Sequence, residues 1–217
     1  MTGNDIIRSS FNPIMGLPCW QVVGEFGTYL TFHFGNPKVV VNEPTEATRH
    51  QRLAWVDGQY VLCLEAYQWV AFQDGGRLAH SESPRDIIRR AAAMLQGQKL
   101  IALTVRANPA GGEFIFDLGG RVAYQVRGPE EETLWDFTTR LDSDPDGVDI
   151  VSFTAAGTVS LFTRRGTAHQ PREYVQETKE YIVEGGAMAV QLSAAPNGGP
   201  AMPLGNSGVA EAPPSVN

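Results

Sequence analysis

The sequence has few cysteines, no long apolar run and a deficit of basic residues. Its two cysteines, Cys19 and Cys63, are too few for a disulfide framework and lack the multi-ligand spacing of a structural zinc site, so reduced, mostly buried thiols are expected. No stretch approaches about eighteen uninterrupted apolar residues, which argues against a membrane span and favours a cytoplasmic location. Seventeen basic against twenty-four acidic side chains give a net charge of −7, which opposes binding to nucleic acid or anionic lipid.

The remaining composition is that of a folded domain. Hydrophobic residues make up 42% and charged residues 19% of the 217 positions, close to globular averages. Only the region from residue 193 onward, rich in glycine and proline, predicts a disordered tail.

The first and second halves share landmarks at an offset of roughly eighty residues. The strand pattern around Phe32 and Phe34 is repeated around Phe114 and Phe116, and Trp55 corresponds to Trp135. Turns are expected after each Phe-x-Phe strand, at Asn36-Pro37 and at Gly119-Gly120. A further hairpin is expected to close each unit, over residues 69–78 and 151–159.

These patterns predict an α+β protein, predominantly antiparallel β, built from two pseudo-repeated β units joined by a helix. The units are expected over residues 1–82 and 97–165, with the helix over 83–96 between them. Ser83 and Pro84 provide a helix start, and Ile6 and Ile7 indicate a shorter equivalent near the N-terminus. Residues 166–192 form a C-terminal extension, helix or strand, in which 187–192 is a candidate to pair with the preceding segment.

Several residues have chemistry that a site needs, and each also has a plain structural explanation. Cys19 and His33 form a candidate nucleophile and base if the fold brings them together, although both equally suit core or surface positions. His80 precedes the joining helix, where its ring is expected to bond a backbone carbonyl and fix the turn. No catalytic motif, metal site or cofactor site is predicted.

The acidic residues form the other candidate surface. The string at Asp142, Asp144 and Asp146 resembles the start of an EF-hand loop but has Phe153 where the bidentate glutamate belongs, so a solvated turn is favoured. Together with Glu130, Glu131 and Glu132 it would form a negative edge able to attract a partner protein, or simply a solubilising surface. The glycine pairs at 75–76, 111–112 and 119–120 predict hairpin turns, and the four tryptophans are expected in the core.

The strings Gly16-Leu17-Pro18-Cys19-Trp20, Ala79-His80-Ser81-Glu82-Ser83 and Phe116-Asp117-Leu118-Gly119-Gly120 make the chain similar to uncharacterised bacterial proteins of unknown function, over residues 12–165. In organisation the repeated unit also resembles small β-rich immunity proteins of toxin systems. Neither resemblance implies catalytic residues. The sequence therefore favours a non-enzymatic protein-binding module. A small hydrolase-like enzyme with a site between the units and a homo-oligomeric structural protein stay open as alternatives.

Overall fold

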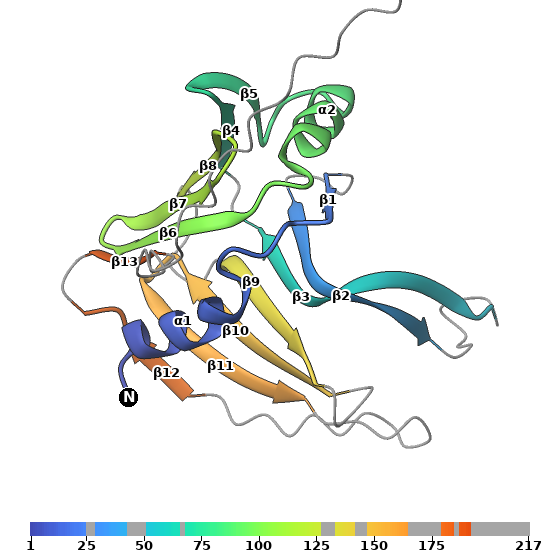
Figure 1. Ribbon diagram of the computed structural model, residues 1–217. Helices are drawn as coiled ribbons and strands as arrows, with labels where there is room; N and C mark the ends of the chain where they lie inside the picture. Colours follow the sequence, from blue (N-terminus) through green and yellow to red (C-terminus); the bar gives the residue numbers. More distant parts are fainter. Residues whose placement is uncertain are drawn as a thin grey trace, which may run out of the picture.

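The structure is a computed structural model that describes residues 1–24, 29–42, 51–65, 68–126, 133–141, 147–164, 179–184 and 187–191. Two antiparallel sheets and two α-helices make up this part of the chain (Figure 1). The prediction of an α+β, predominantly antiparallel β protein is therefore confirmed. None of the helices in the described ranges is long and apolar enough to cross a membrane.

The larger sheet has seven strands. In spatial order they are β1 (Gln21–Val23), β2 (Leu30–Asn42), β3 (Leu53–Leu64), β9 (Thr133–Arg140), β10 (Val148–Thr154), β11 (Thr158–Arg164) and β12 (Lys179–Ile182). The smaller sheet has six strands. Their order is β13 (Ala187–Gln191), β6 (Leu100–Ala107), β7 (Ala110–Phe116), β8 (Gly120–Gln125), β4 (Gln68–Gln73) and β5 (Gly76–His80). Each half of the chain thus contributes strands to both sheets.

The helices were predicted at the right places. The first, α1 (Gly3–Phe11), begins with a capping box between Thr2 and Asp5 and is followed by a short 3-10 turn, η1 (Asn12–Ile14). The second, α2 (Arg85–Leu95), buries one apolar face. Ser83 does not cap α2 as expected, because its hydroxyl accepts a hydrogen bond from the backbone N–H of His80 at 2.9 Å.

One hydrophobic core lies between the sheets. Phe11 of α1 contacts Phe114 of β7 and the rings of Trp135 and Phe137 of β9, so the first helix joins the two layers. A hydrogen bond from Trp135 Nε1 to the Tyr124 hydroxyl, 3.0 Å long, also crosses from one sheet to the other. Aromatic packing and this buried polar contact therefore fix how the sheets sit on each other.

Three hairpins match the sequence prediction. The β4–β5 turn has Asp74 and Gly75 at positive φ, which two-residue hairpin turns require, and β7–β8 and β10–β11 turn near Gly119 and Gly157. The predicted turn at Asn36-Pro37 is wrong, since β2 continues through it with only a register irregularity between Phe34 and Pro37.

Two further expectations are corrected. Gly111 and Gly112 lie inside β7 and not in a turn. Glycine is required at position 112 because a Cβ there would lie 2.0 Å from the carbonyl oxygen of Thr104. In the C-terminal extension, the strand alternative holds for the described residues, but β12 pairs with β11 and β13 pairs with β6. The two segments therefore join different sheets instead of pairing with each other.

Candidate functional site

The long β2–β3 hairpin is the feature that stands apart from the body (Figure 1). Within the described residues, positions 37–42 of β2 and 53–58 of β3 pair only with each other, because β1 pairs with β2 at residues 31–33 and β9 pairs with β3 at residues 60–64. We call this two-stranded extension the arm. Its sequence is β-branched and aromatic, which favours extended backbone.

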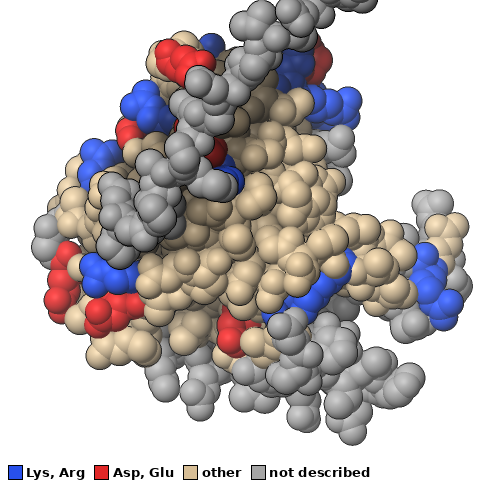
Figure 2. All heavy atoms as spheres, in the orientation of Figure 1, with Lys and Arg blue, Asp and Glu red and all other residues tan. Residues whose placement is uncertain are grey.

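The arm exposes apolar side chains on both faces. Val39 and Val56 are cross-strand partners and are 71% and 46% exposed, and on the opposite face Trp55 is 40% exposed beside Val40. The expectation that all four tryptophans lie in the core is thus wrong for Trp55. In Figure 2 the middle of the projecting ribbon is uncharged, with basic side chains where it leaves the body and near its far end. An apolar surface of this kind marks an interaction site more often than a free surface.

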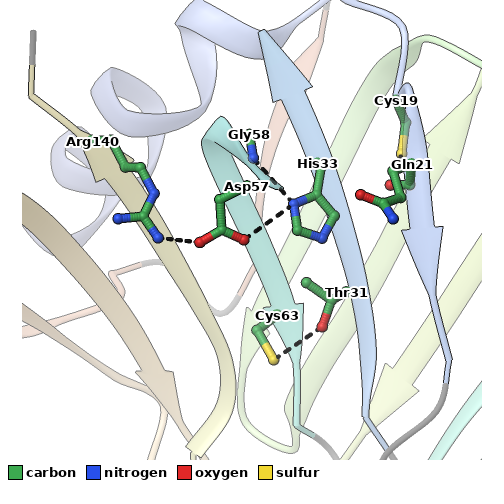
Figure 3. A network of polar contacts seen from close by, with 8 residues as sticks. All are labelled: Cys19, Gln21, Thr31, His33, Asp57, Gly58, Cys63 and Arg140. Carbon is green, nitrogen blue, oxygen red and sulfur yellow. Dashed lines mark hydrogen bonds and ion pairs between the residues drawn. The ribbon is translucent and has the colours of Figure 1, made fainter. Parts of the chain in front are cut away.

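A polar network holds the base of the arm. The Asp57 carboxylate of β3 forms an ion pair with the guanidinium of Arg140 on β9, and the backbone N–H of Gly58 donates to His33 Nδ1 at 3.1 Å (Figure 3). The side chains of His33, Asp57 and Arg140 are only 7%, 13% and 16% exposed. The network therefore ties three strands together where the arm leaves the sheet.

His33 is neutral in this network. Burial is the main cause that lowers its pKa, the Asp57 carboxylate opposes that shift, and Arg140 adds to it. Because Nδ1 accepts the Gly58 hydrogen bond, the ring proton is assigned to Nε2, and the 3.7 Å approach of Asp57 Oδ1 is not a charged pair. Strand alternation places His33 on the opposite face from Phe32 and Phe34, and neighbouring strands bury it there, so of the core and surface positions considered it takes a buried one.

The thiol and imidazole considered as a catalytic pair do not interact. Cys19 is fully buried in the core, where its Sγ–H donates to the backbone carbonyl of Gln21 at 3.2 Å (Figure 3). Burial raises the pKa of Cys19 to about 12, so the thiol is not ionised near neutral pH. The small hydrolase-like enzyme stays an alternative prediction, in which the Cys19 thiol would have to act from its protonated state.

No protein-family model, curated protein or solved structure matches this chain. The residues themselves therefore have to support any functional interpretation.

His80 lies elsewhere, on the outer face of the six-stranded sheet. Its Nδ1 accepts a hydrogen bond from the backbone N–H of Glu82 at 3.3 Å, so the ring fixes the turn before α2 as an acceptor and not, as expected, by bonding a carbonyl. The ring also lines a hollow of about 390 Å³. Neither Cys19 nor His33 lines this hollow.

The acidic residues proposed as a binding edge cannot be placed. Glu130, Glu131, Glu132, Asp142, Asp144 and Asp146 all lie outside the described residues. Within the described ranges, no group of three or more histidine, cysteine, aspartate or glutamate side chains is arranged to hold a metal ion.

Sequence reasoning missed Asp57 and Arg140, which make the network at the base of the arm. The two residues are far apart in the chain, and only the pairing of β3 with β9 brings them together. A second buried carboxylate, Asp136 of β9, accepts a hydrogen bond from Ser152, and burial raises its pKa. No local motif marked any of these residues.

Proposed function

We propose that this chain is a non-enzymatic protein-binding module that binds through the arm, and that its partner is a second copy of the same chain. The observation that carries the proposal is the arm itself, with apolar side chains exposed on both faces and an outer β2 edge without a strand partner in the described residues. Such an edge binds an added strand through main-chain hydrogen bonds. An immunity-like role, suggested by the organisation of the repeated unit, stays a further prediction.

The proposal includes the duplication of one unit. Gly16 N–H donates to the carbonyl of Leu100 and Gly97 N–H donates to the carbonyl of Cys19, both at 2.7 Å, on either side of the antiparallel bridge between Pro18 and Lys99. These reciprocal bonds join corresponding positions of the two halves, as a pseudo-two-fold axis would require. Gly16 and Gly97 also share positive φ, at 80° and 88°.

The strand order supports the same interpretation. A helix and a three-strand meander open each half, α1 with β1–β3 and α2 with β6–β8. The strands that follow then cross to the other sheet, where β4 pairs with β8 and β9 pairs with β3. Each half thus places the strands after its meander in the sheet that the meander of the other half begins.

The arm is what the two halves do not share. In the second half, β7 and β8 turn within a few residues after Phe116, whereas β2 and β3 continue well beyond the sheet. An extension of two strands that exposes apolar residues lowers stability unless another surface packs on it, because an isolated two-stranded ribbon is marginally stable in water. A binding role accounts for its presence.

The arm is complementary to its own copy. If the β2 edges of two chains pair antiparallel about Val40, Val39 of one chain faces Val41 of the other, twice by symmetry. Val39, Val41 and Val56 share one face of the ribbon, so six valines would form one apolar cluster across the interface. Val39 and Val41, 71% and 46% exposed, are the residues that this arrangement buries.

The test is the mass of the chain in solution as a function of concentration. Sedimentation velocity from about 5 to 200 μM covers the range in which a small interface of this kind associates. We expect the wild type to dimerise and the double variant Val39→Lys/Val41→Lys to stay monomeric, because four lysines would meet in one desolvated cluster. Leu118→Lys is the matched control, since Leu118 is 64% exposed in the β7–β8 turn, and it should dimerise normally.

Two results would overturn the proposal. A wild type that stays monomeric over the whole range rules out self-association through the arm. A Val39→Lys/Val41→Lys variant that dimerises like the wild type rules out the β2 edge as the interface.

A further inference from the structure

The outer face of the six-stranded sheet carries a hollow that the arm does not reach. Strand register places His80, Val70, Ala123 and Glu113 in one row across β5, β4, β8 and β7, all on this face. Ala123 is small and Gly111 in the neighbouring row has no side chain, so the sheet surface has a depression at the centre of this face. Longer side chains around it enclose about 390 Å³, within the range of sites for small organic ligands.

Charged side chains of both signs line this hollow, Arg77 and Arg106 together with Glu82 and Glu113. Arg77 of β5 and Arg106 of β6 line it from opposite sides, and in the described part of the chain neither forms an ion pair. Arg121, in contrast, is held in place, since it pairs with Glu113 at 3.6 Å and stacks over the Phe72 ring at 4.3 Å. Glu113 is therefore paired with a third arginine, so Arg77, Arg106 and Glu82 are the remaining charged groups at the hollow and leave one positive charge in excess for an anion.

Uncharged donors and an apolar floor complete the surface. Because His80 Nδ1 accepts the Glu82 N–H, the ring proton is assigned to Nε2, which is the donor that His80 can offer at the hollow it lines. Gln125 Nε2 donates to Gln68 Oε1 at 2.9 Å, which leaves the Gln68 amide nitrogen to donate to a ligand. Val70 and Ala123 form a floor that suits an apolar or aromatic group.

We propose that this hollow binds a small organic anion, with a carboxylate or phosphate held by Arg77 or Arg106 and an aromatic or aliphatic body lying on Val70 and Ala123. Arginine binds both kinds of anion through paired N–H groups, which makes the shared chemistry the anionic oxygens. Counting Arg121, three arginines stand against Glu82 and Glu113 at this face, in a chain whose net charge is −7. The inference rests on the hollow alone and does not depend on dimerisation through the arm.

The experiment is a titration of the full chain with matched probes, followed by amide chemical shifts. Phenyl phosphate and benzoate combine an anion with an aromatic body, inorganic phosphate provides the anion alone, and benzamide provides the body without charge. We expect shifts in β4, β5 and β8 and binding by phenyl phosphate or benzoate that is about tenfold tighter than by inorganic phosphate or benzamide. A preference between phenyl phosphate and benzoate distinguishes a phosphate ligand from a carboxylate ligand.

Variants connect binding to the hollow. Arg77→Gln and Arg106→Gln are each expected to weaken binding, by about tenfold for the arginine that holds the anion. Ala123→Leu should raise the floor and weaken binding without removing any charge. Arg85→Gln on α2, an exposed arginine away from the hollow, is the matched control and should bind as the wild type does.

Two outcomes would refute the inference. The first is the absence of binding by both phenyl phosphate and benzoate at concentrations up to about 5 mM, which is well above the Kd of a specific small-ligand site. The second is binding that survives both arginine substitutions and Ala123→Leu, which would place the ligand elsewhere.

Discussion

Replacing Tyr124 by phenylalanine removes one oxygen from the core and leaves the indole N–H of Trp135 without its partner. Tyr124 and Trp135 are 2% and 0% exposed, so water cannot take the place of the lost hydroxyl. A buried donor without an acceptor costs about 1–3 kcal/mol. We therefore expect the Tyr124→Phe variant to lose about 2 kcal/mol of unfolding free energy, or about 4–8 °C in Tm for a chain of this length.

Equilibrium unfolding in urea, followed by far-UV circular dichroism, measures this loss without relying on tryptophan fluorescence. Tyr60→Phe is the matched control, because the Tyr60 hydroxyl has no hydrogen bond within the described residues although its ring stacks on Phe137. The Trp135→Phe variant and the double variant Tyr124→Phe/Trp135→Phe complete a double-mutant cycle. Each single variant leaves one polar group without its partner, whereas the double variant removes both groups. We expect the double variant to be about 1–2 kcal/mol more stable than the sum of the single losses predicts.

The reasoning fails if Tyr124→Phe is as stable as Tyr60→Phe. It also fails if the cycle shows no coupling, because the cost would then come from packing and not from the hydrogen bond between the sheets.

Three other predictions concern single residues. Since burial lowers the pKa of His33, the unfolded chain binds a proton that the folded chain does not, so stability should fall as the pH drops below 6.5, by at most about 1.4 kcal/mol per unit. His33→Asn keeps an acceptor for the Gly58 N–H but has no ring that takes up a proton. Unfolding curves should therefore show a smaller decrease in unfolding free energy from pH 7 to pH 5 for this variant than for the wild type. Cys19, with its pKa raised to about 12, should react with iodoacetamide at pH 8 only when the protein is unfolded, which mass spectrometry can follow; rapid labelling of the native chain would contradict its burial. Gly112→Ala should cost on the order of 1–3 kcal/mol through its 2.0 Å approach to a backbone oxygen, whereas Gly76→Ala, with 3.3 Å to its nearest atom, should cost clearly less in the same urea assay.

Features that depend on nearby residues were predictable. The Asp74-Gly75 turn, the helix over Arg85–Leu95 and the alternation of β7 follow from local backbone preference and side-chain period. The turn expected at Asn36-Pro37 failed for a related reason. A local signal for a turn did not override the pairing of Pro37 with Gly58, which keeps β2 extended.

The candidate site depended on contacts that no local pattern encodes. Arg77 and Arg106 come from β5 and β6, and only the strand order of the six-stranded sheet places them around one hollow. Trp55 has a side chain typical of a core, but its part of β3 extends beyond β9, and no second layer covers it among the described residues.

The sequence by itself determined that the chain is β-rich, roughly where its two helices lie and where three of its hairpins turn, because these follow from side-chain period and turn chemistry. Tertiary structure alone decided that β3 pairs with β9 and β4 with β8, since main-chain hydrogen bonds between distant strands are the same for every sequence. That choice also buries His33 beside Asp57 and leaves the arm exposed. Which side chains are available to a partner is thus settled by how the two sheets exchange strands, and not by any motif along the chain.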